Sequence, residues 1–162
     1  MINTRDLPKG KLNIALVGAR IDGQAGVILD ALSYYDNVKV VAFFDNTPNK
    51  INEEINGIPV VGNIDEMTGF DDIKIDAVHV AIGDNKARYD IYKELESMGF
   101  QLLSIIHPSA VISPSAKIGE GCFVGANAVI QNNVIINDYV LINTAALIEH
   151  DNVIGKAVHI AP

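Results

Sequence analysis

Residues 106–162 read IHPSAVISPSAKIGEGCFVGANAVIQNNVIINDYVLINTAALIEHDNVIGKAVHIAP, and an aliphatic side chain returns at every sixth position. These positions are Ile106, Ile112, Ile118, Val124, Ile130, Ile136, Ile142, Ile148, Ile154 and Ile160. A period of six fits neither the 3.6-residue period of a helix nor the two-residue period of an alternating strand. It predicts a solenoid in which each hexad forms one face of a triangular coil of about 18 residues, with the aliphatic residue inside. The alternative is a buried sheet that is rich in Ile and Val by chance.

A second position of the repeat, four residues after each of the first nine aliphatic ones, carries a short side chain. The residues there are Ala110, Ala116, Cys122, Ala128, Val134, Val140, Ala146, Asn152 and Val158, of which only Asn152 is polar. Cys122 is the single cysteine, so the chain cannot form an intrachain disulfide and nothing in it requires an oxidising compartment.

The first 105 residues alternate between apolar runs and helical patterns, which is typical of a small parallel α/β sheet. We expect strands at 12–17, 38–44 and 77–82, helices at 24–34 and 86–98, and a last strand at 101–105 that leads into the solenoid. On the first helix, Val27, Ile28, Ala31 and Leu32 are expected to face the core. Residues 1–11 read as a loose lead-in. The predicted domains are therefore 1–105 and 106–162.

Composition limits the classes of function. The chain is 49% hydrophobic and 20% charged, which indicates a folded protein with ample core. Its net charge of −8 argues against a broad nucleic-acid surface, which needs a basic footprint. The sequence shows no apolar run of about 18 residues for a membrane span, no apolar signal segment and no zinc-ligand spacing. We expect a cytoplasmic protein without a metal.

The strongest chemical signal is Glu149-His150-Asp151. From residue 121 to 155 the only other acidic or basic side chain is Asp138. Since Ile148 should point inward, His150 should lie near a corner of the coil, where its side chain can reach outward. A neighbouring carboxylate can fix the tautomer of an imidazole and stabilise the imidazolium. The trio is therefore a candidate site of proton transfer, and the alternative, which is the commoner case for an isolated surface histidine, is a solvated side chain.

Three loops at the ends of predicted strands are candidates for ligand binding. In GARIDG (18–23) the outer glycines suit the dinucleotide fingerprint G-x-G-x-x-G, but Arg20 occupies the middle position. Asp45 and Asn46 end the second strand, where an acidic side chain could accept hydrogen bonds from a ribose or base. Gly83-Asp84-Asn85 ends the third strand. The alternatives are a tight turn without ligand, a turn-forming Asx pair, and a helix N-cap at Asp84.

The segments HPSAVISPSAKIGEGCFVGANAVI (107–130) and NTAALIEHDNVIGKAVHIAP (143–162), preceded by an α/β unit, resemble the sialic-acid O-acetyltransferase and UDP-4-amino-sugar N-acetyltransferase family of hexapeptide-repeat acyltransferases. The resemblance covers nearly the whole chain after the first ten residues. It implies a Rossmann-like domain followed by a left-handed parallel β-helix, an exception to the right-handed crossover rule. It also implies an acetyl-CoA-dependent enzyme that acts on a nucleotide-linked amino sugar, or a sialic-acid-type sugar, in glycan or surface-polysaccharide synthesis. The expected assembly is a homotrimer with the active site between subunits.

The resemblance also implies roles for single residues. His150 would take a proton from the sugar amine or hydroxyl as it attacks the thioester of acetyl-CoA, with Asp151 or Glu149 orienting the imidazole. His159 would lie near the acetyl group, and Asn143 would border the active site. The nucleotide sugar would be held by Gly18, Ala19, Gln24, Asp45, Asn46, Gly83, Asp84, Asn85 and Arg88. Gln24 stands where the family has a histidine.

Two further expectations concern the extent and the class of the protein. The repeat stops at Pro162 in mid-coil, whereas the resembled family continues for several coils, so we expect a truncated chain with an incomplete acetyl-CoA groove. The second class of function is a non-catalytic nucleotide- or NAD-binding regulatory domain whose short β-helix serves as an assembly stalk. Arg20, Gln24 and the missing coils favour this class, and the trio 149–151 favours the enzyme.

Overall fold

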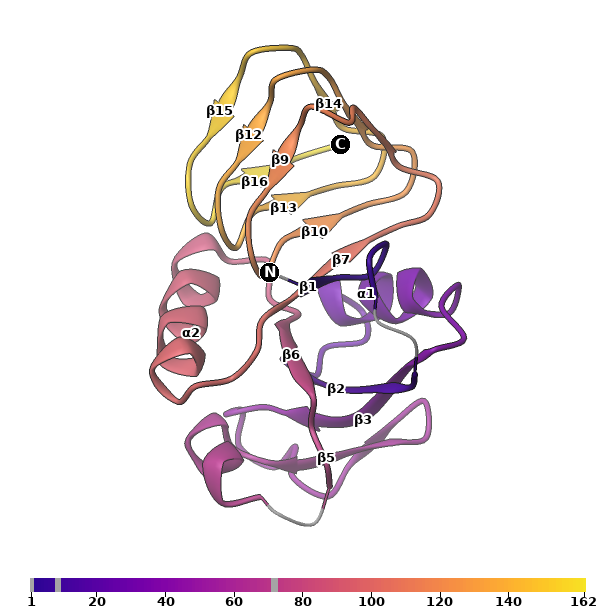
Figure 1. Cartoon of the computed structure of the whole chain (residues 1–162). Coiled ribbons are helices and arrows are strands. Elements are labelled where there is room, and N and C mark those ends of the chain that lie inside the picture. The colour runs from indigo at the N-terminus through magenta and orange to yellow at the C-terminus, as the bar shows by residue number, and fades with distance from the viewer. Residues whose placement is uncertain (1, 8–9, 71–72) are drawn as a thin grey trace.

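Figure 1 shows a computed structural model that describes residues 2–7, 10–70 and 73–162. One half of the molecule is a sheet with two helices, and the other half is a stack of triangular coils drawn in orange and yellow. The two halves are in contact, and the helices lie near the junction between them.

The sheet has five strands in the order β4-β5-β3-β2-β6, and every pair is parallel except β4–β5. Their bounds are β2 Leu12–Val17, β3 Val38–Phe44, β4 Glu54–Ile55, β5 Ile58–Gly62 and β6 Ala77–Val80. The central strand β2 is a nearly unbroken apolar run because it is covered on both faces. The predicted strands at 12–17 and 38–44 are confirmed, and the third ends two residues earlier than expected.

Helix α1 spans Gln24–Leu32, the 3-10 helix η1 spans Ile64–Gly69, and α2 spans Asn85–Ser97. The buried residues of α1 are Ala25, Ile28, Ala31 and Leu32. The prediction that Val27 faces the core is wrong, since its side chain is 41% exposed and Ala25 takes that place one turn before Ile28. Among the described residues, no helix combines the length and the apolar character needed to cross a lipid bilayer.

The coils form three parallel sheets, which we call faces 1, 2 and 3. Face 1 holds β7 (Leu103–Ile106), β10 (Phe123–Val124), β13 (Leu141–Ile142) and β16 (His159–Ile160). Face 2 holds β8 (Val111–Ile112), β11 (Val129–Ile130) and β14 (Leu147–Ile148), and face 3 holds β9 (Lys117–Ile118), β12 (Ile135–Ile136) and β15 (Val153–Ile154). Paired residues such as Ile105, Phe123 and Leu141 are 18 apart, so one coil takes three hexads. The aliphatic and short positions of the repeat fill one core, which confirms the predicted solenoid.

The chain enters the coils earlier than the sequence predicts. Strand β1 (Ile2–Asn3) pairs with β7, and the hydroxyl of Thr4 accepts a hydrogen bond from the Ile106 amide at 2.9 Å. The prediction of a loose lead-in is therefore wrong for these residues, because the open edge of β7 offers them backbone partners; Met1, Pro8 and Lys9 lie outside the described residues. The last strand before the solenoid, expected at 101–105, belongs to face 1, and a single bridge from Leu102 to Val78 ties it to the other sheet.

The α/β domain covers face 1 from outside. The outward side chains of Ile105, Phe123 and Leu141 form one column, and they pack into the same core as α1 and β2. The next member of this column is His159, whose side chain is exposed at the edge of the covered area. The domain contact therefore brings the start of β16 close to the α/β sheet.

Candidate functional site

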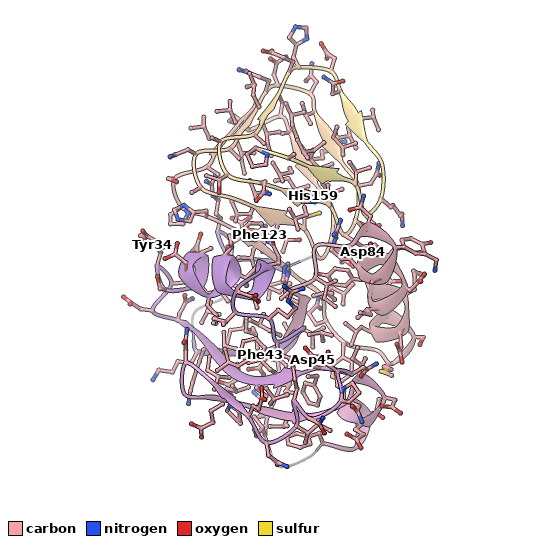
Figure 2. All side chains as sticks on the ribbon, turned by 180° about the vertical axis from the view of Figure 1, so that it is seen from behind. Tyr34, Phe43, Asp45, Asp84, Phe123 and His159 are labelled. Atoms are coloured by element: carbon pink, nitrogen blue, oxygen red, sulfur yellow. The ribbon has the colours of Figure 1, made fainter. Side chains whose placement is uncertain are left out.

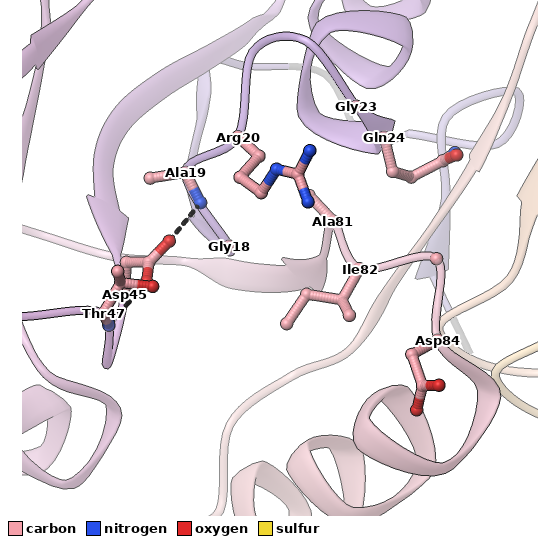
Figure 3. Close-up of a pocket in the computed structure, with 11 residues that line it drawn as sticks. Gly18, Ala19, Arg20, Gly23, Gln24, Asp45, Thr47, Ala81, Ile82 and Asp84 are labelled. Atoms are coloured by element: carbon pink, nitrogen blue, oxygen red, sulfur yellow. Dashed lines mark hydrogen bonds between the residues drawn. The ribbon is translucent and has the colours of Figure 1, made fainter. Parts of the chain in front are cut away.

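A pocket opens at the carboxyl ends of β2, β3 and β6 (Figure 3). Its lining residues are Gly18, Ala19, Arg20, Gly23, Gln24, Asp45, Thr47, Ala81, Ile82, Gly83 and Asp84. Here the chain passes from β2 through α1 to β3 on one side, while β6 lies on the other side of β2. Ligands of open α/β sheets bind in the crevice at such a switch point. Six of the predicted binding residues line this pocket: Gly18, Ala19, Gln24, Asp45, Gly83 and Asp84.

Gly18 lines the pocket at a point where there is no room for a side chain. Its φ of +99° is in the region that favours glycine, and a Cβ on it would lie 2.7 Å from Cγ1 of Ile82. Any side chain at this position would push the two strand ends apart. The first glycine of GARIDG is thus required by packing, whether or not a ligand is bound.

Asp45 fixes the shape of the first loop. Its Oδ2 accepts a hydrogen bond from the Ala19 amide at 2.7 Å, and its Oδ1 accepts one from the Thr47 amide at 2.8 Å. Burial by itself raises the pKa of this carboxyl, but the hydrogen bonds from Thr47 and Ala19 outweigh burial and bring the pKa below its ordinary value. The Thr47 side chain is a further hydrogen-bond partner of this carboxyl, so Asp45 holds both loops, and its contact with a ribose stays a prediction.

Two polar side chains at the pocket mouth are poorly satisfied within the chain. Figure 3 shows the guanidinium of Arg20 extending over Ala81 and Ile82. Its ion pair with Asp22 is 3.4 Å long and both side chains are 74% exposed, so the pair is weak. The side-chain nitrogen of Gln24 is buried and has no hydrogen-bond partner. A buried amide without a partner costs about 1–3 kcal/mol, which an acceptor on a ligand could recover.

The other three predicted α/β residues do not line this pocket. Asn46 accepts a hydrogen bond from the Ile64 amide at 2.8 Å and lines a neighbouring hollow. Asn85 accepts one from Arg88 at 3.0 Å, and Arg88 itself is 2% exposed. Asp84 is also the N-cap of α2, which was the alternative interpretation of this residue, because its Oδ1 accepts a hydrogen bond from the Ala87 amide at 2.8 Å.

Arg88 lies behind the wall of the pocket. Its Nε donates to the carbonyl of Tyr139 at 2.9 Å, and its Nη1 donates to the carbonyls of Ile82 and Gly83 at 3.0 and 2.8 Å. Its Nη2 donates to Asn85 and to the carbonyl of Ala157, the latter at 2.7 Å. A guanidinium has five N–H donors, and these contacts use all of them. Arg88 thus has no donor left for a nucleotide sugar.

His150 and Asp151 lie at the corner between β14 on face 2 and β15 on face 3. The Nδ1 of His150 is 2.7 Å from Oδ2 of Asp151. Asp151 has a φ of +58°, a conformation that Asp tolerates better than most residues. Its other oxygen accepts a hydrogen bond from Nδ2 of Asn133 at 3.0 Å, and the amide of Asn133 donates to the Ser115 hydroxyl at 3.0 Å. A polar column therefore runs down the corner below the histidine.

This geometry sets the tautomer of His150. A carboxylate oxygen only accepts, so Nδ1 carries a hydrogen, and in the neutral imidazole the lone pair is on Nε2, which faces away from Asp151. The hydrogen bond from Asn133, and after it the one from His150, lowers the pKa of Asp151 below its ordinary value. The carboxylate is thus ionised at neutral pH. Of the two predicted partners, Asp151 contacts the imidazole, while the side chain of Glu149 is exposed and only its carbonyl is bonded, to Asn152.

Asn143 and His159 form a separate pair. The side-chain amide of Asn143 donates to Nε2 of His159 at 3.2 Å, which joins the end of β13 to the start of β16. Partial burial, and after it the charge of Arg88, lowers the pKa of His159. Figure 2 shows His159 close to the junction of the two domains, on the same side as Asp84. The predicted site residues thus lie in three places: the pocket, the Asn143–His159 pair and the His150 corner.

The structure adds residues that the sequence analysis missed. Asn133 stands one coil below Asp151, and the 18-residue period could have revealed it. Arg20 and Thr47 line the pocket but were not assigned to it, and they follow the strands whose ends were recognised. Within residues 2–7, 10–70 and 73–162, no three His, Cys, Asp or Glu side chains gather as a metal site would require.

A parallel β-helix with a carboxylate-oriented histidine at one corner, joined to a small Rossmann-like sheet, defines the class of hexapeptide-repeat acyltransferases. Residues 13–95 match the family described as the PglD N-terminal domain. Residues 104–132 and 115–150 match the bacterial transferase hexapeptide (six repeats). A comparison with curated proteins gives no match.

Three solved structures extend this result. PerB from Caulobacter crescentus, in complex with CoA and GDP-perosamine, is 34% identical with a TM-score of 0.80, over 95% of this chain and 70% of that one. The acetyltransferase domain of PglB from Neisseria gonorrhoeae, in complex with acetyl coenzyme A, is 32% identical with a TM-score of 0.81, over 93% and 70%. WeeI from Acinetobacter baumannii shares the fold at 23% identity and a TM-score of 0.77, over 92% and 69%.

The chain therefore belongs to the hexapeptide-repeat sugar acetyltransferases whose first domain is the PglD N-terminal domain. The predicted fold class, a Rossmann-like domain followed by a left-handed parallel β-helix, is confirmed. The family resemblance read from residues 107–130 and 143–162 is confirmed as well.

Proposed function

We propose that this protein transfers the acetyl group of acetyl-CoA to a nucleotide-linked amino sugar, with His150 as the general base. The observation that carries the proposal is the 2.7 Å contact between Nδ1 of His150 and Asp151, which orients the ring so that Nε2 is the nitrogen that accepts a proton. Two relatives above 30% identity support the choice of substrates, since one was solved with CoA and GDP-perosamine and the other with acetyl coenzyme A.

In this proposal His150 acts twice. Its Nε2 accepts a proton from the sugar amine, or from a hydroxyl, as that group forms a bond to the thioester carbon. When the carbon–sulfur bond breaks, the imidazolium returns the proton to the departing sulfur. Asp151 holds the ring in one tautomer and stabilises the positive charge that the ring carries between these two proton transfers. In the same proposal, His159 lies near the acetyl group and Asn143 borders the active site.

The pocket of Figure 3 is the proposed site of the nucleotide sugar. The amides of Ala19 and Thr47 are already bonded to Asp45, so the available donors in this lining are the guanidinium of Arg20 and the side-chain nitrogen of Gln24, which suit an anionic diphosphate ester. The alternative, a non-catalytic NAD-binding domain, gives the His150–Asp151 arrangement no role. A cytoplasmic location stays a prediction from the sequence.

Assembly into a homotrimer is part of the proposal, because His150 stands on an open corner with its side chain 65% exposed. The outward side chains on both flanks of this corner are largely apolar. Face 2 presents Val111 and Leu147 at 62% and 57% exposure, and face 3 presents Ile135 and Val153 at 40% and 66%. A second copy packed on these columns would cover them and enclose His150.

The proposal is tested in two steps. Calorimetric titration with UDP-, GDP- and CMP-linked amino sugars, and with NADH, examines the pocket alone. Acetyl transfer is then measured for the wild type and for His150→Ala, for which we expect kcat to fall by about 10²- to 10⁴-fold with unchanged affinity for the nucleotide sugar. Binding of NADH without binding of any nucleotide sugar would exclude the enzyme.

A further inference from the structure

Arg88 joins three segments that are far apart in the sequence. Its guanidinium is held by the pocket wall at Ile82 and Gly83, by the turn before β13 at Tyr139, and by the turn before β16 at Ala157. All of these partners are backbone carbonyls, and none is a carboxylate. A buried positive charge is costly unless every donor is satisfied, so the three segments must keep the positions that satisfy it.

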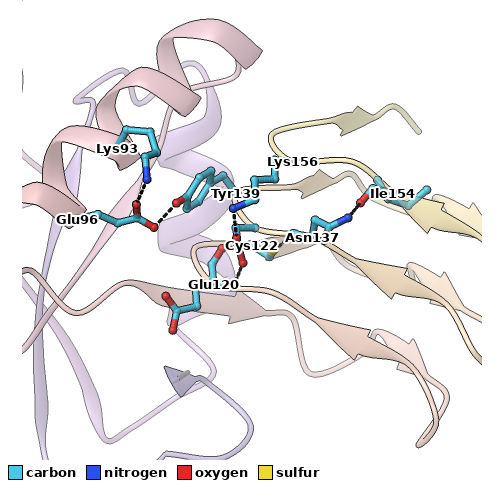
Figure 4. Close-up of polar contacts among 9 residues, drawn as sticks. Lys93, Glu96, Glu120, Cys122, Asn137, Tyr139, Ile154 and Lys156 are labelled. Atoms are coloured by element: carbon cyan, nitrogen blue, oxygen red, sulfur yellow. Dashed lines mark hydrogen bonds and ion pairs between the residues drawn. The ribbon is translucent and has the colours of Figure 1, made fainter.

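The same face of α2 makes two more contacts with the solenoid. Tyr92 stacks on the ring of Tyr139 with centroids 4.7 Å apart and an interplanar angle of 16°. Glu96 accepts a hydrogen bond from the Tyr139 hydroxyl, as Figure 4 shows. Residues 88, 92 and 96 are four apart and therefore share one side of the helix. Helix α2 is thus fastened to the coils along three turns, and its first turn begins at the pocket wall.

The turn at Ala157 leads directly into β16, whose first residue is His159. Arg88 therefore connects the wall of the pocket to the segment that carries His159 through one rigid, planar group. We propose that Arg88 is a positioning residue for acetyl transfer: it holds the bound nucleotide sugar in register with His159 and the acetyl-transfer site, and does not itself contact a substrate. This inference rests on the proposed function, because it needs the sugar in the pocket of Figure 3.

Lysine cannot replace this group. An ammonium has three donors around a point, whereas the guanidinium reaches opposite sides of the junction with a fixed fork. Arg88→Lys would keep the charge and lose the geometry. Since a displacement of about 1 Å at a reacting centre can cost about 10²-fold in rate, the variant should lose turnover more than binding.

The test compares Arg88→Lys with Lys86→Ala, a variant of the same helix that removes an exposed ion pair with Asp90. Calorimetry gives the affinity for the nucleotide sugar, steady-state kinetics gives kcat and KM, and thermal unfolding gives the stability. For Arg88→Lys we expect kcat to fall by about 10²-fold while KM for the nucleotide sugar changes by less than about threefold. For Lys86→Ala we expect both to stay at the wild-type value.

A second measurement needs no variant. The imidazole signals of His159 are recorded by NMR in the wild type with and without UDP or GDP, whichever binds, and the inference expects them to shift although the pocket is separate from His159. Unchanged signals, unchanged kcat in folded Arg88→Lys, or a loss confined to KM would each overturn it. If no nucleotide sugar binds to the wild type, the proposed function fails first, and that outcome is separate from a failure of Arg88 alone.

Discussion

The side chain of Asn133 donates a hydrogen bond to Asp151 across one full coil of the β-helix, with Nδ2 and Oδ1 3.0 Å apart. Both residues have a positive φ, and they repeat the same corner position 18 residues apart. The carboxylate that orients His150 is therefore itself held from below. Asn133 therefore supports the proposed base indirectly: it holds Asp151, and Asp151 holds the imidazole of His150.

Asn133→Ala should reduce turnover without touching the pocket. The substitution removes the donor to Asp151, which frees the carboxylate to rotate away from His150, and we expect kcat to fall about threefold to tenfold. Asn127→Ala is the matched control, because Asn127 has a φ of +56° against +59° for Asn133 and stands at a different corner. Equal kcat values for the two variants would show that the column does not support the base.

Arg20→Gln should weaken the binding of the nucleotide sugar. Arg20 is a pocket cation with only a weak partner, so its loss removes a charge-assisted contact with phosphate, and we expect about a tenfold rise in Kd. The variant should also bind with less dependence on salt, because ionic contacts are screened. Calorimetry at two salt concentrations measures both effects.

The control for Arg20 is Lys11→Gln, which removes the same charge next to the amino end of β2, opposite the pocket. An equal loss of affinity in both variants would mean that only net charge matters. Unchanged affinity in Arg20→Gln would leave Arg20 as part of a tight turn without ligand, the alternative that the sequence left open.

The sequence predicted the solenoid because its core positions form a strict repeat, and each hexad carries its own evidence. The same repeat located His150 at a corner, since Ile148 had to point inward. What the sequence could not provide were relationships across the domain junction. The family resemblance implied that Arg88 binds the nucleotide sugar, yet its donors turn towards Tyr139 and Ala157, 51 and 69 residues away. No local pattern encodes that direction.

The error at Val27 has a similar origin. Two apolar stripes are possible on a nine-residue helix, and the choice depends on which one the sheet and β7 cover. The N-terminal strand was missed because Ile2 and Asn3 have no pattern of their own and pair only where β7 leaves an open edge. Tertiary contacts therefore decided both features.

His79 should make the free energy of unfolding depend on pH. The ring is 1% exposed, its Nδ1 lies 2.8 Å from the Leu103 carbonyl, and burial lowers its pKa to about 4. Between that value and the ordinary pKa near 6.5, the unfolded chain binds a proton that the folded chain does not. The stabilisation is therefore complete above pH 6.5 and is lost as the pH falls, by about 3 kcal/mol at pH 4.

Urea titrations of the wild type and His79→Asn between pH 4 and 7 measure this contribution. The amide of Asn can still donate to Leu103 but does not titrate, so the slope in this range should be smaller in the variant. Identical slopes would assign the acid sensitivity to carboxylates elsewhere in the chain.

Leu147→Glu should separate assembly from nucleotide-sugar binding. Leu147 is 57% exposed on face 2, beside the corner that carries His150, and it stacks in register with Val129 and Val111. A carboxylate there would be buried without a partner if a second copy packs on this column, at a cost of several kcal/mol. We expect the variant to sediment as a smaller species than the wild type and to lose acetyl transfer, while it binds the nucleotide sugar as before. Ile51→Glu, at a 37% exposed position of the α/β domain, is the control and should keep both the assembly and the activity. If Leu147→Glu instead remains in the wild-type assembly with full activity, then the copies contact each other through another face. The apolar columns of faces 2 and 3 would then not be the surfaces that enclose His150.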